Sequence, residues 1–240
     1  MSGEVKLIKK IKNYWKNKFK NEKKGFAKGM CGYKIFLIFA IFSVFGVYYE
    51  QILNLVQYYF DDGILFWEIR RGVLYGPFNP LYGFGAIIFV YFLAERNYSN
   101  SKIFLLGSLI GGLIEYIICF LQEMFIGTTS WNYDGYFLNI GGRTTIPFMI
   151  VWGLLSLLLV KKIYPKISRF IESMPYNIMR SVTIFLIVFL SLDMFVSWTA
   201  LFRQNYRKRG IPPKTFIGEL YDKYYTDTYL QKHFPNMRFD

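Results

Sequence analysis

The sequence predicts an all-α protein: a polytopic transmembrane helix bundle of about five spans, preceded by a basic amphipathic N-terminal helix. Hydrophobic residues make up 53% of the 240 residues and aromatic residues 21%, whereas only 19% are charged. The apolar residues form long runs, and the basic residues lie between these runs and at the chain ends, as in membrane proteins. We predict a basic interfacial segment over 1–34, a transmembrane helix bundle over 35–202 and a polar C-terminal tail over 203–240.

The N-terminal segment 1–34 contains eleven lysines and only two acids. Its apolar residues recur at helical spacing, at Ile8, Ile11, Trp15 and Phe19. Such a helix would lie on the anionic leaflet and direct its lysines toward lipid phosphates, so membrane lipids are expected partners. A solvated basic arm is the alternative. The net charge of +13 does not indicate nucleic-acid binding, because the basic residues are separated by long apolar runs.

Five segments are apolar enough to cross a bilayer, since about 20 helical residues span about 30 Å of hydrocarbon. We predict spans over 35–57, 73–94, 103–125, 145–160 and 179–202. The second span is interrupted by Pro77 and Pro80, and the fourth is short. Interrupted spans need protein neighbours or a water-filled cavity to satisfy their free backbone groups.

The distribution of Lys and Arg predicts the orientation of the chain. The N-terminus and the 161–180 connection are basic and should therefore be cytoplasmic, whereas the connections 58–72 and 126–144 should face outside. Five spans also place the tail outside. The tail, however, starts with a basic cluster, which favours the cytoplasmic side. This cluster is Arg203, Arg207, Lys208 and Arg209.

The segment 70–86 is the first candidate binding element. It contains four glycines, which allow close backbone approach, and two prolines, which prevent a regular helix. A polar ligand could bind at the exposed backbone, near Arg71, Tyr75, Asn79 and Tyr82. The alternative is a tightly packed start of a helix whose glycines serve helix contact.

Acidic residues inside predicted spans are the second candidate. Glu115 and Asp193 lie near the middle of their spans, and Glu50 lies toward the outer end of the first span. Gln122 follows Glu115 on the same helical face. A carboxylate at this depth should face the bundle interior and be either paired or protonated, which makes it a candidate functional group. The alternative is that these acids only fix the register of their helices through hydrogen bonds.

The segment 130–143 is the third candidate. Trp131 and Tyr133 suit a membrane interface, and Asn139 lies before two glycines. Arg143, at the start of a short helix, could hold a carboxylate or a lipid phosphate. Alternatively, Arg143 neutralises Glu50 or Glu115.

Motifs for common enzyme chemistry are absent from the sequence. It contains no G-x-x-x-x-G-K-[ST] loop, so transport driven by ATP would need a separate ATPase subunit. Cys31 and Cys119 lie far apart, and the lone His233 lies in the tail, so neither a disulfide framework nor a metal site is predicted. We expect no cofactor.

Several short motifs occur in one order between about residues 36 and 208. They are FGVYYE at 45–50, RGVLYGP at 71–77, PLYGFGA at 80–86, EY at 115–116, WNY at 131–133, NIGGR at 139–143 and WG at 152–153, with Asp193 and Ser197 matching more weakly. In these motifs the chain resembles a family of small bacterial membrane proteins labelled putative ABC-transporter type IV permeases. It departs from that family at Val47, where a Trp is usual, and at Asn79, where a Cys is usual. The resemblance implies a permease in the bacterial cell membrane.

The leading hypothesis is a transport component that binds a small polar, anionic or amphiphilic substrate between its helices. The predicted binding residues are Glu50, Arg71, Tyr75, Asn79, Tyr82, Glu115, Trp131, Tyr133, Asn139, Arg143 and Asp193. The three acids would form an inner polar cluster, and the two arginines an outer, anion-attracting side. One alternative is a membrane-embedded enzyme with an acid as general base and Arg143 on a lipid phosphate. The other is a non-catalytic scaffold.

Overall fold

The computed structural model describes residues 26–235 and 237–239. It confirms the all-α polytopic class: in this part of the chain, four helices are long and apolar enough to cross a membrane, and one apolar helix is shorter. The predicted amphipathic helix falls mostly on residues 1–25, outside the described residues.

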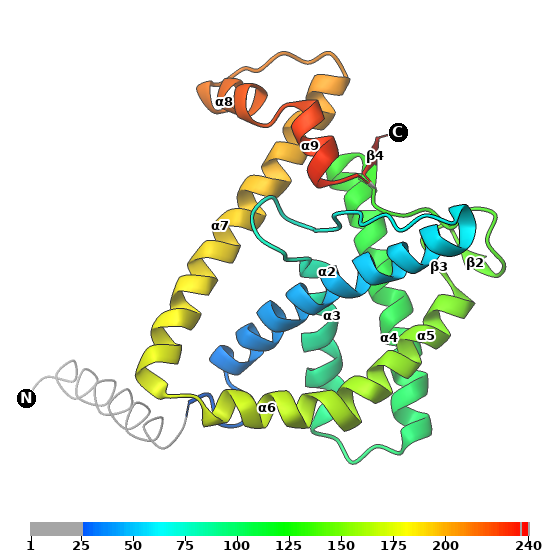
Figure 1. Ribbon diagram of the computed structural model, residues 1–240, viewed down its shortest axis with the longest axis vertical. Helices are drawn as coiled ribbons and strands as arrows, with labels where there is room; N and C mark the ends of the chain where they lie inside the picture. Colours follow the sequence, from blue (N-terminus) through cyan, green and yellow to red (C-terminus); the bar gives the residue numbers. More distant parts are fainter. Residues whose placement is uncertain (1–25, 236, 240) are drawn as a thin grey trace, which may run out of the picture.

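The long helices of Figure 1 correspond to the predicted spans with shifted ends. They are α2 (Gly32–Asp62), α4 (Asn100–Leu121) with the π-helical turn η2 (Gln122–Ile126), α5 (Ile146–Leu158) with η3 (Leu159–Ile163) and α6 (Tyr164–Ser173), and α7 (Tyr176–Lys208). The short helix is α3 (Pro80–Phe89) with η1 (Val90–Ala94). The tail forms α8 (Phe216–Tyr224) and α9 (Asp227–His233). The strands pair as β1 (Thr128–Thr129) with β4 (Arg238–Phe239) and β2 (Asn139–Ile140) with β3 (Thr144–Thr145), both antiparallel.

Two predicted spans differ from the helices observed. The predicted span over 73–94 becomes helical only at Pro80, where the side chain of Asn79 accepts a hydrogen bond from the Leu81 amide. The residues before it stay irregular, since Gly76 takes a left-handed φ of 75°. The span over 145–160 continues as helix to Ser173, because π-helical η3 carries the backbone past the apolar run.

Small residues allow α4 and α5 to pack closely. A Cβ added at Gly107 would lie 1.9 Å from Oγ of Ser156, and one at Gly111 would lie 2.3 Å from Cβ of Trp152. Glycines spaced four residues apart form a flat helix face, on which a neighbouring helix can approach at backbone distance. The two helices therefore lie in close contact along this face.

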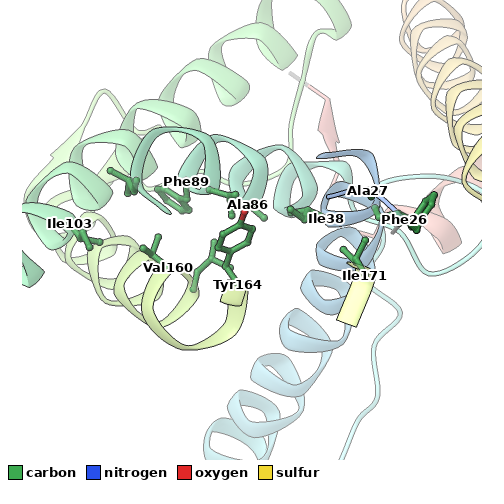
Figure 2. Packing of buried hydrophobic residues seen from close by; sticks show 13 residues of the cluster. Phe26, Ala27, Ile38, Ala86, Phe89, Ile103, Val160, Tyr164 and Ile171 are labelled. Carbon is green, nitrogen blue, oxygen red and sulfur yellow. The ribbon is translucent and has the colours of Figure 1, made fainter. Parts of the chain in front are cut away.

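A hydrophobic core joins the starts of α2 and α4 to the α3 and α6 regions. Figure 2 shows Phe89 of α3 and Ile103 of α4 around Val160, with Ile38 of α2 in the same cluster. Beside this core, the buried ammonium of Lys34 forms an ion pair with Glu172 of α6. Because that lysine is only 1% exposed, the carboxylate replaces the water that the cation loses.

The tail folds back on the far end of α7, at the top of Figure 1. Nε and Nη2 of Arg203 donate to the two carboxylate oxygens of Asp222 at 2.8 and 2.7 Å. Arg207 also forms ion pairs, with Asp222 and Asp227. The basic cluster at the start of the tail favoured a cytoplasmic tail. Two of its four residues, Arg203 and Arg207, form ion pairs with acids of the tail itself.

Candidate functional site

A cavity of about 670 Å³ lies between the helices and the folded tail. Its wall includes residues of α2, α3, α4, α5, η2 and α7, together with loop residues and the end of the chain. Seven of the eleven predicted binding residues line it: Glu50, Arg71, Asn79, Tyr82, Glu115, Trp131 and Tyr133. Segments far apart in the sequence thus share one concave site.

One part of the cavity wall carries charge around Glu50. Nδ2 of Asn79 donates to Oε2 of Glu50 at 3.2 Å, which joins α2 to the start of α3. The neighbouring Arg70 forms an ion pair with Glu68. Arg71 donates through Nη1 to the carbonyl of Leu74 at 3.1 Å and, among the described residues, forms no ion pair. Its guanidinium therefore keeps most of its five donors for another acceptor.

Both carboxylate oxygens of Glu115 accept hydrogen bonds from hydroxyl groups. Tyr133 donates to Oε1 at 3.1 Å, and Thr144 donates to Oε2 at 2.8 Å. Burial raises the pKa of the Tyr133 phenol, and the nearby Glu115 raises this pKa further, so the phenol stays a donor. The ring of Tyr133 also stacks on Phe148, with centroids 4.9 Å apart. These contacts hold the 127–145 loop against α4.

The remainder of the wall is mostly apolar and aromatic. The apolar and aromatic residues of this part are Pro80, Leu81, Tyr82, Phe84, Ile118, Leu121, Phe125, Ile126, Trp131, Trp152, Trp198, Leu201, Phe202, Phe234, Pro235 and Met237. Nε1 of Trp131 donates to the carbonyl of Arg143 at 3.0 Å, which satisfies its polar atom and leaves the indole as an apolar surface. The cavity thus combines a few polar groups with a wide apolar wall, as small-molecule sites usually do.

Four predicted binding residues are not among those that line the cavity. Arg143 forms an ion pair with Glu123 and lies over the ring of Tyr116, 5.3 Å from its centroid. The alternative that Arg143 neutralises Glu50 or Glu115 does not hold, because its ion pair is with Glu123 of η2. The hydrogen bond from this guanidinium to Glu123 raises the pKa of Arg143.

Asp193 holds the irregular segment before α3. Its Oδ1 accepts from the Tyr75 amide at 3.1 Å and from Oγ of Ser197 at 3.1 Å, while Ser197 also accepts from the Leu74 amide at 2.8 Å. Asp193 is therefore not among the residues that line the cavity with Glu50 and Glu115.

Tyr75 and Asn139 also make contacts outside the cavity. The Tyr75 hydroxyl lies 2.9 Å from that of Tyr225 in the tail. The Asn139 side chain donates to the Tyr136 carbonyl and accepts from the Gly142 amide, so it stabilises the turn before β3.

Several lining residues were not predicted as binding residues. Gln122 and Ser130 lie near predicted binding residues in the sequence but were not themselves predicted. Nε2 of Gln122 donates to Oγ of Ser130 at 3.0 Å. Trp198, Phe234 and Met237 lie in segments whose local sequence carries no sign of a site. Among the described residues, no group of three or more His, Cys, Asp and Glu side chains could hold a metal ion.

The helices define a multi-pass membrane protein, and a cavity of about 670 Å³ lies inside its bundle. The chain belongs to the family described as putative ABC-transporter type IV, whose sequence model matches residues 37–198, and it is therefore related to membrane transport proteins. This confirms the family that the motifs indicated. No curated protein matches the chain, and neither does any solved structure.

Proposed function

We propose that this chain is a transport component that binds a small anionic amphiphile in the cavity between its helices. The observation that carries the proposal is the combination of Arg71, which has free donors, with a wide aromatic wall in one cavity of about 670 Å³. This volume lies within the range of about 300–1,000 Å³ that is typical of sites for small molecules.

The acids of the cavity already accept hydrogen bonds from the protein, which supports a ligand with a negatively charged head group. Glu115 already accepts two hydroxyl hydrogen bonds, and Glu50 accepts one from Asn79. Arg71 uses one donor on a backbone carbonyl. A phosphate, sulfate or carboxylate head would therefore find its donors at Arg71, and its apolar part would lie on Trp131, Trp152 and Trp198.

The sequence and the family also support proposals for the energy source and the cellular setting. The chain has no P-loop, so we propose a separate ATPase subunit as its partner. We also propose that it resides in the bacterial cell membrane with its N-terminus in the cytoplasm, because basic residues flank that end. The alternative of a lipid-modifying enzyme gains no support from Arg143, since Glu123 already pairs with it.

The binding test uses the full chain purified in a maltoside detergent. Dodecyl phosphate is titrated while tryptophan fluorescence is measured, because three tryptophans line the cavity. We expect saturable binding that Arg71→Gln weakens about ten- to hundredfold, since a hydrogen bond to a charged group contributes about 1.5–3 kcal/mol.

Two controls define the outcome of this titration. Arg169→Gln removes an exposed charge from α6 and should leave binding unchanged. Dodecyltrimethylammonium, with the same alkyl chain and a positive head, should bind more weakly than the phosphate. Absence of saturable phosphate binding, or equal affinity for the two heads, would overturn the proposed anionic specificity.

A further inference from the structure

Part of the cavity wall comes from beyond the region that defines the family. The family match ends at residue 198, whereas Phe234, Pro235 and Met237 line the cavity from the end of the chain. We call residues 227–235 and 237–239 the C-terminal strap. It comprises α9, the residues that follow it and strand β4.

Apolar packing docks the strap on the bundle. Leu230 is 1% exposed and Phe234 is 4% exposed, and both belong to a cluster with Leu74, Ile126 and Leu201. Leu74 lies in the segment before α3, Ile126 ends η2, and Leu201 belongs to α7. The strap therefore seals the place where three separate segments meet.

Backbone pairing fixes the last residues over the cavity. Strand β4 pairs antiparallel with β1, which is separated from the end of η2 by one residue. Two hydroxyl groups point at the sulfur of Met237: Oγ1 of Thr128 donates to it at 3.4 Å, and Oγ of Ser130 at 3.7 Å. Since Ser130 and Met237 both line the cavity, the Met237 side chain lies directly beside a cavity-lining hydroxyl.

Ion pairs hold the first residue of the C-terminal strap and the segment before it. Arg207 of α7 donates to Asp227, the first residue of α9, at 2.9 Å, and to Asp222 at 2.7 Å. Arg203 holds Asp222 through two further hydrogen bonds. These contacts lie outside the cavity, so they position the strap without occupying the space for a ligand.

We propose that the C-terminal strap is the outer wall of the cavity and that Phe234 and Met237 limit the size of the amphiphile that fits. A ligand then enters or leaves when the strap undocks. The identity of the ligand rests on the proposed function, whereas the presence of the wall does not. The two parts therefore need separate measurements.

The wall is tested by chemical accessibility, without any ligand. In a Cys31→Ser/Cys119→Ala background, Ser130→Cys places a thiol beneath Met237, and its reaction rate with a water-soluble maleimide is measured in detergent. Leu230→Ala/Phe234→Ala should undock the strap and raise the rate at least tenfold. Deletion of residues 211–240 should raise it further. Rates within twofold of the intact chain in both variants would overturn the proposal.

A second thiol separates undocking from unfolding. Thr183→Cys lies in the buried part of α7, 0% exposed and far along the helix from the tail. It should react slowly in every strap variant. If the deletion exposes Thr183→Cys, the deletion variant is unfolded, and the Leu230→Ala/Phe234→Ala variant decides the question.

The size limit is tested with alkyl phosphates of eight to sixteen carbons. Phe234→Ala and Met237→Ala should each shift the tightest-binding length to longer chains and improve affinity for the longest chain at least fivefold. Unchanged length preference would overturn the size limit while leaving the wall intact. If no alkyl phosphate binds the unmodified chain, the proposed function fails, and the maleimide rates still decide whether the strap is a wall.

Discussion

Thr144 donates a hydrogen bond of 2.8 Å to Oε2 of Glu115, a residue 29 positions earlier in the chain. Both residues are buried, at 2% and 6% exposed. A carboxylate in a membrane bundle needs such donors, because it has lost its water. This contact and the bond from Tyr133 are what tie the 127–145 loop to α4 and shape one side of the cavity.

Thr144→Val should destabilise the protein by about 1–3 kcal/mol, because it keeps the shape of the side chain but leaves a buried carboxylate oxygen without its donor. The measurement is thermal unfolding in detergent. Thr183→Val is the matched control: Thr183 is also buried, but it donates only to the Met179 carbonyl in its own helix. Equal losses for the two variants would contradict the role given to Thr144.

The ion pair of Arg203 and Asp222 predicts an acid-dependent tail. The hydrogen bond from Arg203 lowers the pKa of Asp222 below its ordinary value of 3.8. A lowered pKa means that the pair stabilises the fold fully above pH 3.8 and that this contribution disappears as pH falls through the folded pKa. The difference in unfolding temperature between wild type and Asp222→Asn should therefore be largest near neutral pH and shrink in acid. A difference that stays constant with pH would refute it.

Gly107→Ala should destabilise the α4–α5 pair by about 1–3 kcal/mol, because the new methyl group overlaps the Ser156 hydroxyl in a packed interface. Gly85→Ala is the matched control, since Gly85 is also a buried helical glycine but a Cβ there meets nothing within 4 Å. The control should be neutral or more stable by up to about 1 kcal/mol. Unfolding temperatures of the two variants test this contrast.

Ser197→Ala should destabilise the protein by about 1–3 kcal/mol, since it removes the buried hydroxyl that accepts from the Leu74 amide. Ser181→Ala on the exposed part of the same helix should stay within about 0.5 kcal/mol. Protease cleavage between residues 63 and 79 should also speed up in Ser197→Ala, because Ser197 and Asp193 hold that segment together. Unchanged cleavage would show that other contacts are sufficient.

Much of the fold could be predicted from local sequence. Apolar runs marked the long helices, and Pro77 with Pro80 marked the interrupted span. The exact first residue of a helix depended on its N-cap. Helix α3, for example, begins at Pro80 because Asn79 caps it. The continuation of α5 into α6 was not predictable from hydropathy, because two lysines and a proline ended the apolar run although the helix continued.

The candidate site was predictable only in part. Glu50 and Glu115 stood out because charged residues within membrane spans are rare. Arg71 stood out because it lies at the start of the glycine- and proline-rich segment, and all three residues line the cavity. The pairing of Arg143 with Glu123 was not among the alternatives considered, because sequence spacing cannot show that η2 carries Glu123 toward the loop. Phe234 and Met237 had no local signal, since their role depends on a chain end folding back over a distant surface.

The sequence by itself determined that this is a helical membrane protein of its family, because hydropathy, helical spacing and short motifs are properties of neighbouring residues. Only the tertiary structure decided which charges pair, which acids share the cavity and where the tail lies. Those contacts join residues such as Ser197 and Leu74, 123 positions apart, and depend on how whole helices pack. The tail, polar by composition, becomes part of the bundle because Leu230 and Phe234 bury their side chains against it.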